Sequence, residues 1–242
     1  KKNYSDNDSF LKEADDLNLL AKNLDKSYIK IPQIKSINKH ELQLERILKD
    51  KPNKKQMQNL GTGLAKLHKI KFDFFGAKED NYIGLNLQKN VISDNWGTFF
   101  VEYRLDYQVE LIKTNSIKEE FKEILLNKRN KLAEFLNLSC EHASLVHGDL
   151  WSGNVLFDEE DVWLIDPSSY YANREVDIAT TEIFLGFSQE FYDAYNKEYA
   201  LSEHYEKNKI IFNLYHYLNH YNLFGNTYLE ECKKAFDFIK KL

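Results

Sequence analysis

The sequence is poor in residues that interrupt, cross-link or anchor a chain. It has 9 Gly and 3 Pro in 242 residues, below their typical shares of roughly 7% and 5%, so collagen-like and linker-rich proteins are excluded. Its cysteines, Cys140 and Cys232, lie far apart with no Cys-x-x-Cys pair, which excludes a zinc ribbon and a disulfide framework. No apolar run approaches about 18 residues and no signal-peptide pattern opens the sequence. We therefore expect a cytoplasmic protein without membrane contact.

Positive charge is scarce as well. The chain has 33 Lys and Arg against 38 Asp and Glu, for a formal net charge of −5, and it contains no basic block. A dedicated nucleic-acid-binding protein is therefore not expected. Apolar residues make up 43% and charged residues 29% of the sequence, which is an ordinary globular composition. The length fits one large domain or two modest lobes.

The hydrophobic pattern changes along the chain and indicates an α+β protein. A helix is expected after Ser9, and alternating residues predict strands over 29–34 and 40–45. Helical periodicity dominates after Pro52. A small β insert interrupts it, with an expected strand at 144–147 and an expected hairpin over 155–165.

Polar residues without periodicity gather in the loop His147–Asn154, which precedes that hairpin. The loop has the pattern His-x-Asp-x4-Asn, and the hairpin ends on Asp166. Phosphoryl transfer needs a carboxylate beside the acceptor hydroxyl and oxygen ligands that hold Mg²⁺ on the phosphates. Asp149 can supply the first, and Asn154 and Asp166 the second. This combination matches the kinase catalytic-loop pattern and predicts a phosphotransferase.

The same segments resemble the fructosamine kinase (ketosamine kinase) family, which has the two-lobed fold of aminoglycoside phosphotransferases and protein kinases. The segments that carry the resemblance are Asn81–Gly84, Leu145–Val155, Ile165–Pro167, Tyr170–Asp177 and His216–Asn222. The tryptophan of the catalytic loop and the run Arg174–Asp177 distinguish this family from its antibiotic-modifying relatives. The resemblance implies a partial N-terminal β lobe over residues 1–47 and a mainly helical lobe over residues 48–242.

The resemblance also implies ATP and Mg²⁺ as cofactors and assigns roles to matching positions. Asp149 corresponds to the catalytic base, and Asn154 and Asp166 correspond to the metal ligands. Lys1 corresponds to the phosphate-binding lysine, and Glu13 to the helix glutamate that pairs with it.

Further positions match the hinge and a structural residue of the family. Glu45, Arg46 and Ile47 resemble the hinge between the lobes, whose backbone would bind adenine. Asp177 resembles an aspartate that braces the catalytic loop. The implied substrate is a ketosamine, which is a sugar attached to an amine, either as a small molecule or on a protein. Its phosphorylation on a hydroxyl would be a step in deglycation.

Three residues are candidates for contact with that substrate. The ring of Trp151 can stack on a sugar or an amine substituent, or it can pack within its own loop. His216 and His220 are four residues apart and can share a helix face as metal ligands, but without a third ligand at suitable spacing a packing role is favoured. The helix that carries them is expected to border the acceptor pocket.

One departure from the family concerns the beginning of the chain. The family has two further strands and a Gly-rich loop before the phosphate-binding lysine, whereas this sequence starts at Lys1. Two interpretations follow, a truncated sequence or a catalytically impaired protein. The alternatives to a ketosamine kinase are therefore an aminoglycoside- or choline-type kinase and a nucleotide-binding pseudokinase.

Overall fold

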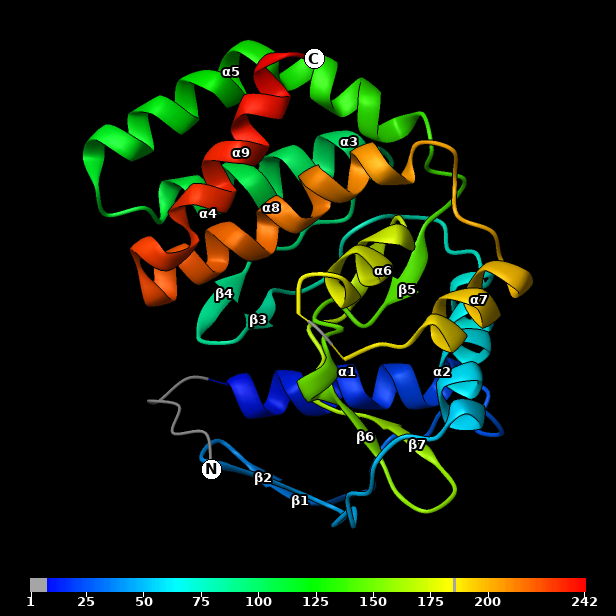
Figure 1. The fold of residues 1–242 in the computed structure, drawn as a ribbon. Helices are drawn as coiled ribbons and strands as arrows, with labels where there is room; N and C mark the ends of the chain where they lie inside the picture. The colour runs from blue at the N-terminus through cyan, green and yellow to red at the C-terminus, as the bar shows by residue number, and fades with distance from the viewer. Residues whose placement is uncertain (1–7, 185) are drawn as a thin grey trace.

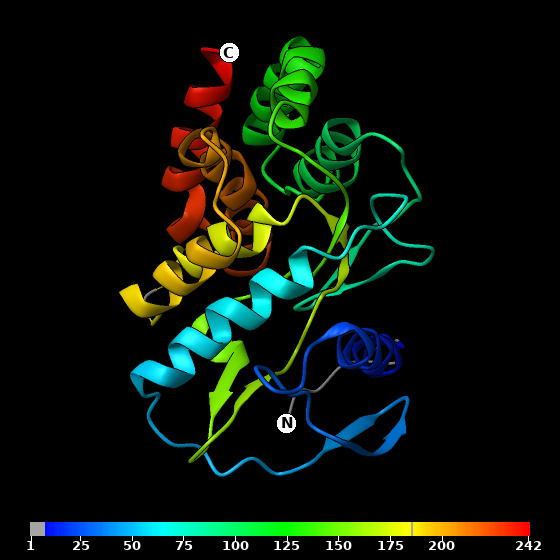
Figure 2. The ribbon, with the colours of Figure 1, turned by 90° about the vertical axis from the view of Figure 1, so that its right-hand side faces the viewer.

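The computed structural model describes residues 8–184 and 186–242. Lys1 therefore lies outside the described residues. The chain forms a small lobe with one helix and a β-hairpin, and a larger helical lobe (Figure 1). The view turned by 90° shows the same separation (Figure 2). This arrangement agrees with the expected α+β, two-lobed architecture.

The small lobe consists of α1 (Ser9–Asn23), β1 (Ile34–Asn38) and β2 (Glu41–Leu44). One face of α1 is buried because its apolar residues recur at helical spacing, as Ala14, Leu17 and Leu20 illustrate. The two strands pair antiparallel and are largely exposed.

The strand expected over 29–34 is wrong in its position. Regular pairing begins only at Ile34, because Pro32 has no amide hydrogen to donate to a sheet. The preceding segment instead makes a single parallel bridge between Lys30 and Trp163 of the large lobe.

That bridge joins the two lobes. The amide of Lys30 donates to Val162 O at 2.8 Å, and Leu164 N donates to Lys30 O at 3.0 Å. After the hinge, Asp50 N donates to Phe157 O at 2.7 Å. The small lobe is therefore attached on both sides of its hairpin to the hairpin that ends at Asp166.

The large lobe is built mainly from helices around one apolar core. Its helical elements are α2 (Lys54–His68), α3 (Trp96–Phe99), the π-helical η1 (Phe100–Asp106), α4 (Tyr107–Glu110), α5 (Asn115–Asn137), η2 (Ser152–Asn154), α6 (Glu175–Thr181), α7 (Gln189–Glu198), α8 (Tyr205–Phe224), η3 (Asn226–Tyr228) and α9 (Leu229–Lys240). The start of α2 is fixed by a capping box, in which Gln56 N donates to the Asn53 side chain at 2.9 Å and Asn53 N to that of Gln56 at 3.0 Å. No helix among the described residues is long and apolar enough to span a bilayer.

Short strand pairs frame the central loops of this lobe. They are β3 (Asn81–Ile83) with β4 (Asn86–Gln88), β5 (Ser144–Val146) with β8 (Tyr170–Ala172), and β6 (Val155–Phe157) with β7 (Val162–Leu164). The predicted hairpin is confirmed as β6 and β7, and the predicted strand before the loop is confirmed as β5. The sequence did not predict β3, β4 or β8, because their residues (Asn-Tyr-Ile, Asn-Leu-Gln and Tyr-Tyr-Ala) form no continuous aliphatic-rich run like those that indicate β6 and β7.

Candidate active site

The loop His147–Asn154 runs from β5 to β6 and lies against the segment that follows β7. Gly148 has φ 82°, and a Cβ atom at this position would lie 2.1 Å from Ser168 O. Only glycine fits such a close approach in the left-handed region. Ser168 N also donates to His147 O at 2.9 Å. The backbone itself therefore brings the loop and the 166–168 segment together.

The amide of Asn154 connects three of the predicted site residues. Its Nδ2 donates to Asp149 O at 2.9 Å, to Asp149 Oδ2 at 3.1 Å and to Asp166 O at 3.4 Å. Asp166 itself has φ 57°, a backbone conformation that is uncommon outside glycine and is often found at functional sites. The Asn154 amide thus lies between the Asp149 side chain and the backbone of Asp166.

Asn154 and Asp166 offer a sparse set of oxygen atoms for the predicted metal ion. The described residues contain no group of three or more His, Cys, Asp or Glu that could hold a metal ion. One carboxylate and one amide oxygen, from Asp166 and Asn154, suit Mg²⁺, which keeps several waters and binds substrate phosphates. The donor set fits a magnesium ion that arrives with a nucleotide.

The buried ring of His147 contacts the backbone of both segments that carry the predicted site carboxylates, at Asp149 and at Ile165 before Asp166. It is fully buried, and its Nε2 lies 3.1 Å from Ile165 O, to which it can only donate. Its Nδ1 then accepts from Asp149 N at 3.3 Å. Burial lowers the pKa of His147, so the ring is neutral at neutral pH. His147 therefore serves as a structural residue and is not a base.

Asp177, at the beginning of α6, holds the loop from the other side. Its carboxylate accepts from His147 N at 2.7 Å and from Gly148 N at 2.9 Å, and His68 Nε2 lies 3.3 Å away. Burial alone would raise the pKa of Asp177, but the hydrogen bond from His68 and the other donors lower it. A buried anion therefore fixes the backbone immediately before Asp149.

Helix α1 is attached to the site through a buried carboxylate. Asp16 accepts from Asn81 Nδ2 at 2.8 Å and from Ser169 N at 3.1 Å. Ser169 follows Asp166 closely along the chain. Glu13 precedes Asp16 by three residues, which places both on the same side of α1. This contact sets the position of the predicted lysine partner relative to the loop.

His216, on α8, approaches the predicted base. Its Nδ1 lies 3.9 Å from Asp149 Oδ1, and its Nε2 lies 2.9 Å from Thr180 Oγ1. Burial, with His220 nearby, lowers the pKa of His216 to about 3. The ring is therefore neutral, and the short distance to Asp149 is not an ion pair. Since Thr180 Oγ1 donates to Val176 O at 2.8 Å, the proton of His216 lies on Nε2 and its Nδ1 lone pair faces Asp149.

The other two substrate candidates belong to a group of rings beside the loop. Trp151 is 38% exposed, packs over the backbone of Gly153 and meets Phe184 edge to face at 5.8 Å. The ring centre of His220 lies 5.6 Å from that of Phe184, and its Nδ1 donates to His216 O at 2.8 Å. The two histidines thus engage different partners and do not converge on a metal.

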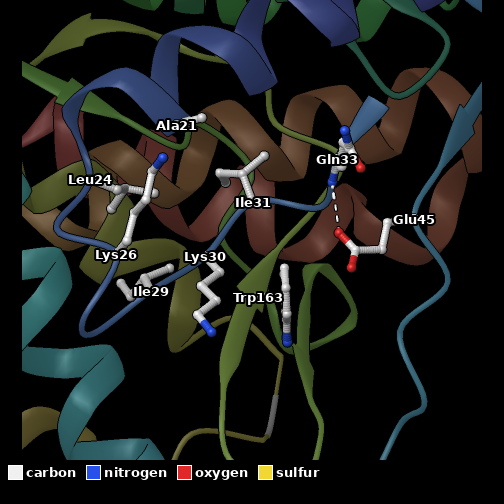
Figure 3. A pocket seen from close by; sticks show the side chains of 9 residues that line it. All are labelled: Ala21, Leu24, Lys26, Ile29, Lys30, Ile31, Gln33, Glu45 and Trp163. Atoms are coloured by element: carbon white, nitrogen blue, oxygen red, sulfur yellow. Dashed lines mark hydrogen bonds between the residues drawn. The ribbon is translucent and has the colours of Figure 1, made fainter. Parts of the chain in front are cut away.

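The predicted hinge lies at the surface between the lobes. The backbone amide of Glu45 donates to Gln33 O at 2.8 Å, and its carboxylate accepts from Gln33 N at 3.1 Å (Figure 3). This side chain lines a pocket of about 220 Å³ that also contacts Trp163 of β7. Arg46 is exposed and Ile47 is partly exposed. The side chain of Glu45 therefore links the predicted hinge to Gln33, the residue before β1.

Sequence reasoning assigned no role to Asp16, Asn81 or His68. The sequence signal for Asp16 is its spacing, because it lies four residues before Leu20 and so shares the buried face of α1. Asn81 opens a segment that carried the family resemblance. The partner of His68 is more than a hundred residues away in the sequence, so no local pattern could indicate it.

Comparison with solved structures defines the fold class. A Haemophilus somnus protein that bears the name fructosamine-3-kinase superposes with a TM-score of 0.84 at 28% identity, over 98% of this chain and 81% of that one. The ADP-bound aminoglycoside phosphotransferase APH(2'')-Ib superposes with a TM-score of 0.56 at 15% identity, over 96% and 82%, a likeness that shows the fold alone. The chain has a protein-kinase-like fold.

Sequence comparison gives the family. A family model described as fructosamine kinase matches residues 2–241, and the chain belongs to this family. A probable ketoamine kinase of Vibrio vulnificus is 41% identical over 169 residues, 68% of this chain and 56% of that protein. A chloroplastic protein-ribulosamine 3-kinase of Arabidopsis thaliana is 37% identical over 185 residues, 74% and 55%. The chain thus matches little more than half the length of these relatives.

Proposed function

We propose that the protein is an ATP- and Mg²⁺-dependent phosphotransferase that phosphorylates a sugar hydroxyl of a ketosamine, free or protein-bound. The observation that carries this proposal is the convergence of Asp149, Asn154 and Asp166 through the amide of Asn154. Family membership and the names of the relatives support the substrate class.

Each residue then has a defined task. Asp149 orients the acceptor hydroxyl and takes its proton as the oxygen attacks the γ-phosphoryl group. Asn154 and Asp166 hold Mg²⁺, which when bound offsets negative charge on the phosphates. The family pattern assigns Lys1 to the phosphates, Glu13 to the partner of this lysine, and the backbone of Glu45, Arg46 and Ile47 to adenine.

The acceptor side suits a cationic amine. A ketosamine carries a secondary amine that is protonated at neutral pH. The ring of His216 lies 3.9 Å from the Asp149 carboxylate and is neutral, so it does not repel such a substrate. The exposed part of Trp151 offers an aromatic surface for the same cation or for the sugar.

ATP turnover on a fructosamine and a ribulosamine, measured side by side, tests the proposal. The protein should be expressed from its complete coding sequence, with an aminoglycoside and choline as comparison acceptors. We expect ADP release that depends on a ketosamine and on Mg²⁺. Turnover on the aminoglycoside or choline alone would contradict the substrate class. Nucleotide binding without turnover on any acceptor would indicate a pseudokinase.

A further inference from the structure

Arg174 lies in the segment that distinguishes the family, yet the site described above gives it no task. It is the residue before α6, is 6% exposed, and its guanidinium contacts Tyr195 of α7 and the backbone of Ala200. Its NH1 donates to the hydroxyl of Tyr195 at 3.0 Å. Its guanidinium carbon lies 3.6 Å from the ring centre of Tyr199. Arg174 is thus a buried cation, and Tyr195 and His68 lie between it and Asp177.

The charges at the two ends, Arg174 and the Asp177 anion, together set the direction of the hydrogen bonds between them. An arginine can only donate, so the Tyr195 oxygen accepts from it. The single hydroxyl proton of Tyr195 then points to His68 Nδ1 at 2.9 Å. A neutral imidazole has one N–H, which therefore lies on Nε2 and faces Asp177 Oδ2 at 3.3 Å. Each bond polarises the next in the same sense.

The charges and burial of the group agree with this assignment. His68 and Asp177 are fully buried, and Tyr195 is 1% exposed. Burial lowers the pKa of His68, which keeps the ring neutral, and raises the pKa of Tyr195. Asp177 keeps its charge, because the pKa of this carboxyl is lowered. Arg174 and the Asp177 anion are thus joined by two neutral groups, and a second buried carboxylate, that of Glu175, lies 3.8 Å from Arg174 NH2.

We propose that His68 and Tyr195 are positioning residues that carry the orienting effect of Arg174 to Asp177 and thereby fix the backbone of the catalytic loop. The proposal rests on the proposed function only for its activity readout. Asp177 binds the amides of His147 and Gly148, which directly precede Asp149. If Asp177 loses its third donor, the carboxylate can turn, and Asp149 loses its fixed position.

Four variants of the full chain test this proposal. His68→Leu removes the donor to Asp177, whereas His68→Gln restores an N–H near the position of Nε2. Tyr195→Phe removes only the hydroxyl that connects Arg174 with His68. Tyr192→Phe is the matched control, because Tyr192 lies on the same helix and its hydroxyl contacts Thr181 Oγ1 at 3.1 Å.

The first readout is kinetic. We expect His68→Leu to lower kcat by about 10- to 100-fold with the KM for ATP changed less than about twofold, since an unsatisfied buried charge has a penalty of this size. His68→Gln should recover most of the loss. Tyr195→Phe should lower kcat by about 3- to 10-fold, and Tyr192→Phe should not change it.

The second readout is independent of catalysis. Amide hydrogen exchange at His147 and Gly148 should accelerate in His68→Leu and Tyr195→Phe, while the amides of β6 and β7 keep their wild-type rates. Exchange at His147 and Gly148 equal to that of Tyr192→Phe would overturn the proposal. A wild-type protein without ketosamine turnover would refute the proposed function, and the exchange rates would still decide this one. If His68→Leu does not fold, Tyr195→Phe provides the same comparison.

Discussion

The two sides of the candidate site are held together in different ways. Around Asp149 the chain folds on itself, and the contacts of Gly148, Asn154 and Asp166 link residues within about twenty positions of one another. On the nucleotide side, α1 carries Glu13 and is joined to the loop segment through the buried carboxylate of Asp16. The base side is thus built largely by contacts within one stretch of the chain, which Asp177 and His68 brace from outside it. On the nucleotide side, α1 is joined to the site by long-range contacts such as that of Asp16 with Ser169. Changes at the two sides should therefore have different consequences.

The largest effect is expected from Asp149→Asn. The substitution keeps the size of the side chain but removes the group that takes the proton of the acceptor. Turnover should fall by about 10²–10⁴-fold, while nucleotide affinity stays nearly unchanged. Steady-state kinetics with a ketosamine and a nucleotide-binding titration measure the two quantities. A variant with full turnover would show that Asp149 is not the base.

The same contrast explains what the sequence revealed. Asp149, Asn154 and Asp166 were predicted together, because their spacing along one loop and one hairpin leaves few ways to arrange them. His68 and Asp16 received no role, because each acts through a partner that is brought close only by the packing of distant helices. Lys1 lies outside the described residues. The roles of Lys1, Glu13 and the hinge therefore remain predictions.

An intermediate effect is expected at the contact that fixes α1. Burial raises the pKa of the Asp16 carboxyl from its ordinary 3.8 to about 7, against the hydrogen bonds from Asn81 and Ser169, which lower it. Asp15 raises this pKa and Lys12 lowers it. Between these pH values the folded chain binds more protons at Asp16 than the unfolded chain, so this group's contribution to stability falls as the pH rises.

Asp16→Asn should remove that loss, because an amide keeps the acceptor oxygen without the charge. Relative to the wild type, the free energy of unfolding of the variant should increase by about 2–4 kcal/mol between pH 4 and pH 8. Urea denaturation at several pH values measures the difference. Asp15→Asn is the matched control, since its side chain is exposed on the same helix. Parallel pH profiles for Asp16→Asn and the wild type would contradict the assignment.

The smallest effect is expected at the junction of the lobes, where backbone and side chain can be separated. Lys30 binds β7 through its own amide and carbonyl, and its Nζ forms an ion pair with Asp161 at 2.5 Å. Both side chains are about one-third exposed, so water screens the pair.

Lys30→Met keeps the two backbone hydrogen bonds and most of the packing on Trp163, and it removes only the charge. The loss in the free energy of unfolding should therefore stay below about 1 kcal/mol, with an unchanged KM for ATP. Denaturation and kinetics of Lys30→Met, next to Lys35→Met on the exposed hairpin, measure both. A loss well above that limit, or a raised KM, would mean that the ion pair rather than the backbone bridge sets the angle between the lobes. The nucleotide side of the site would then depend on a side-chain contact between the lobes as well as on Asp16 and the backbone bridge.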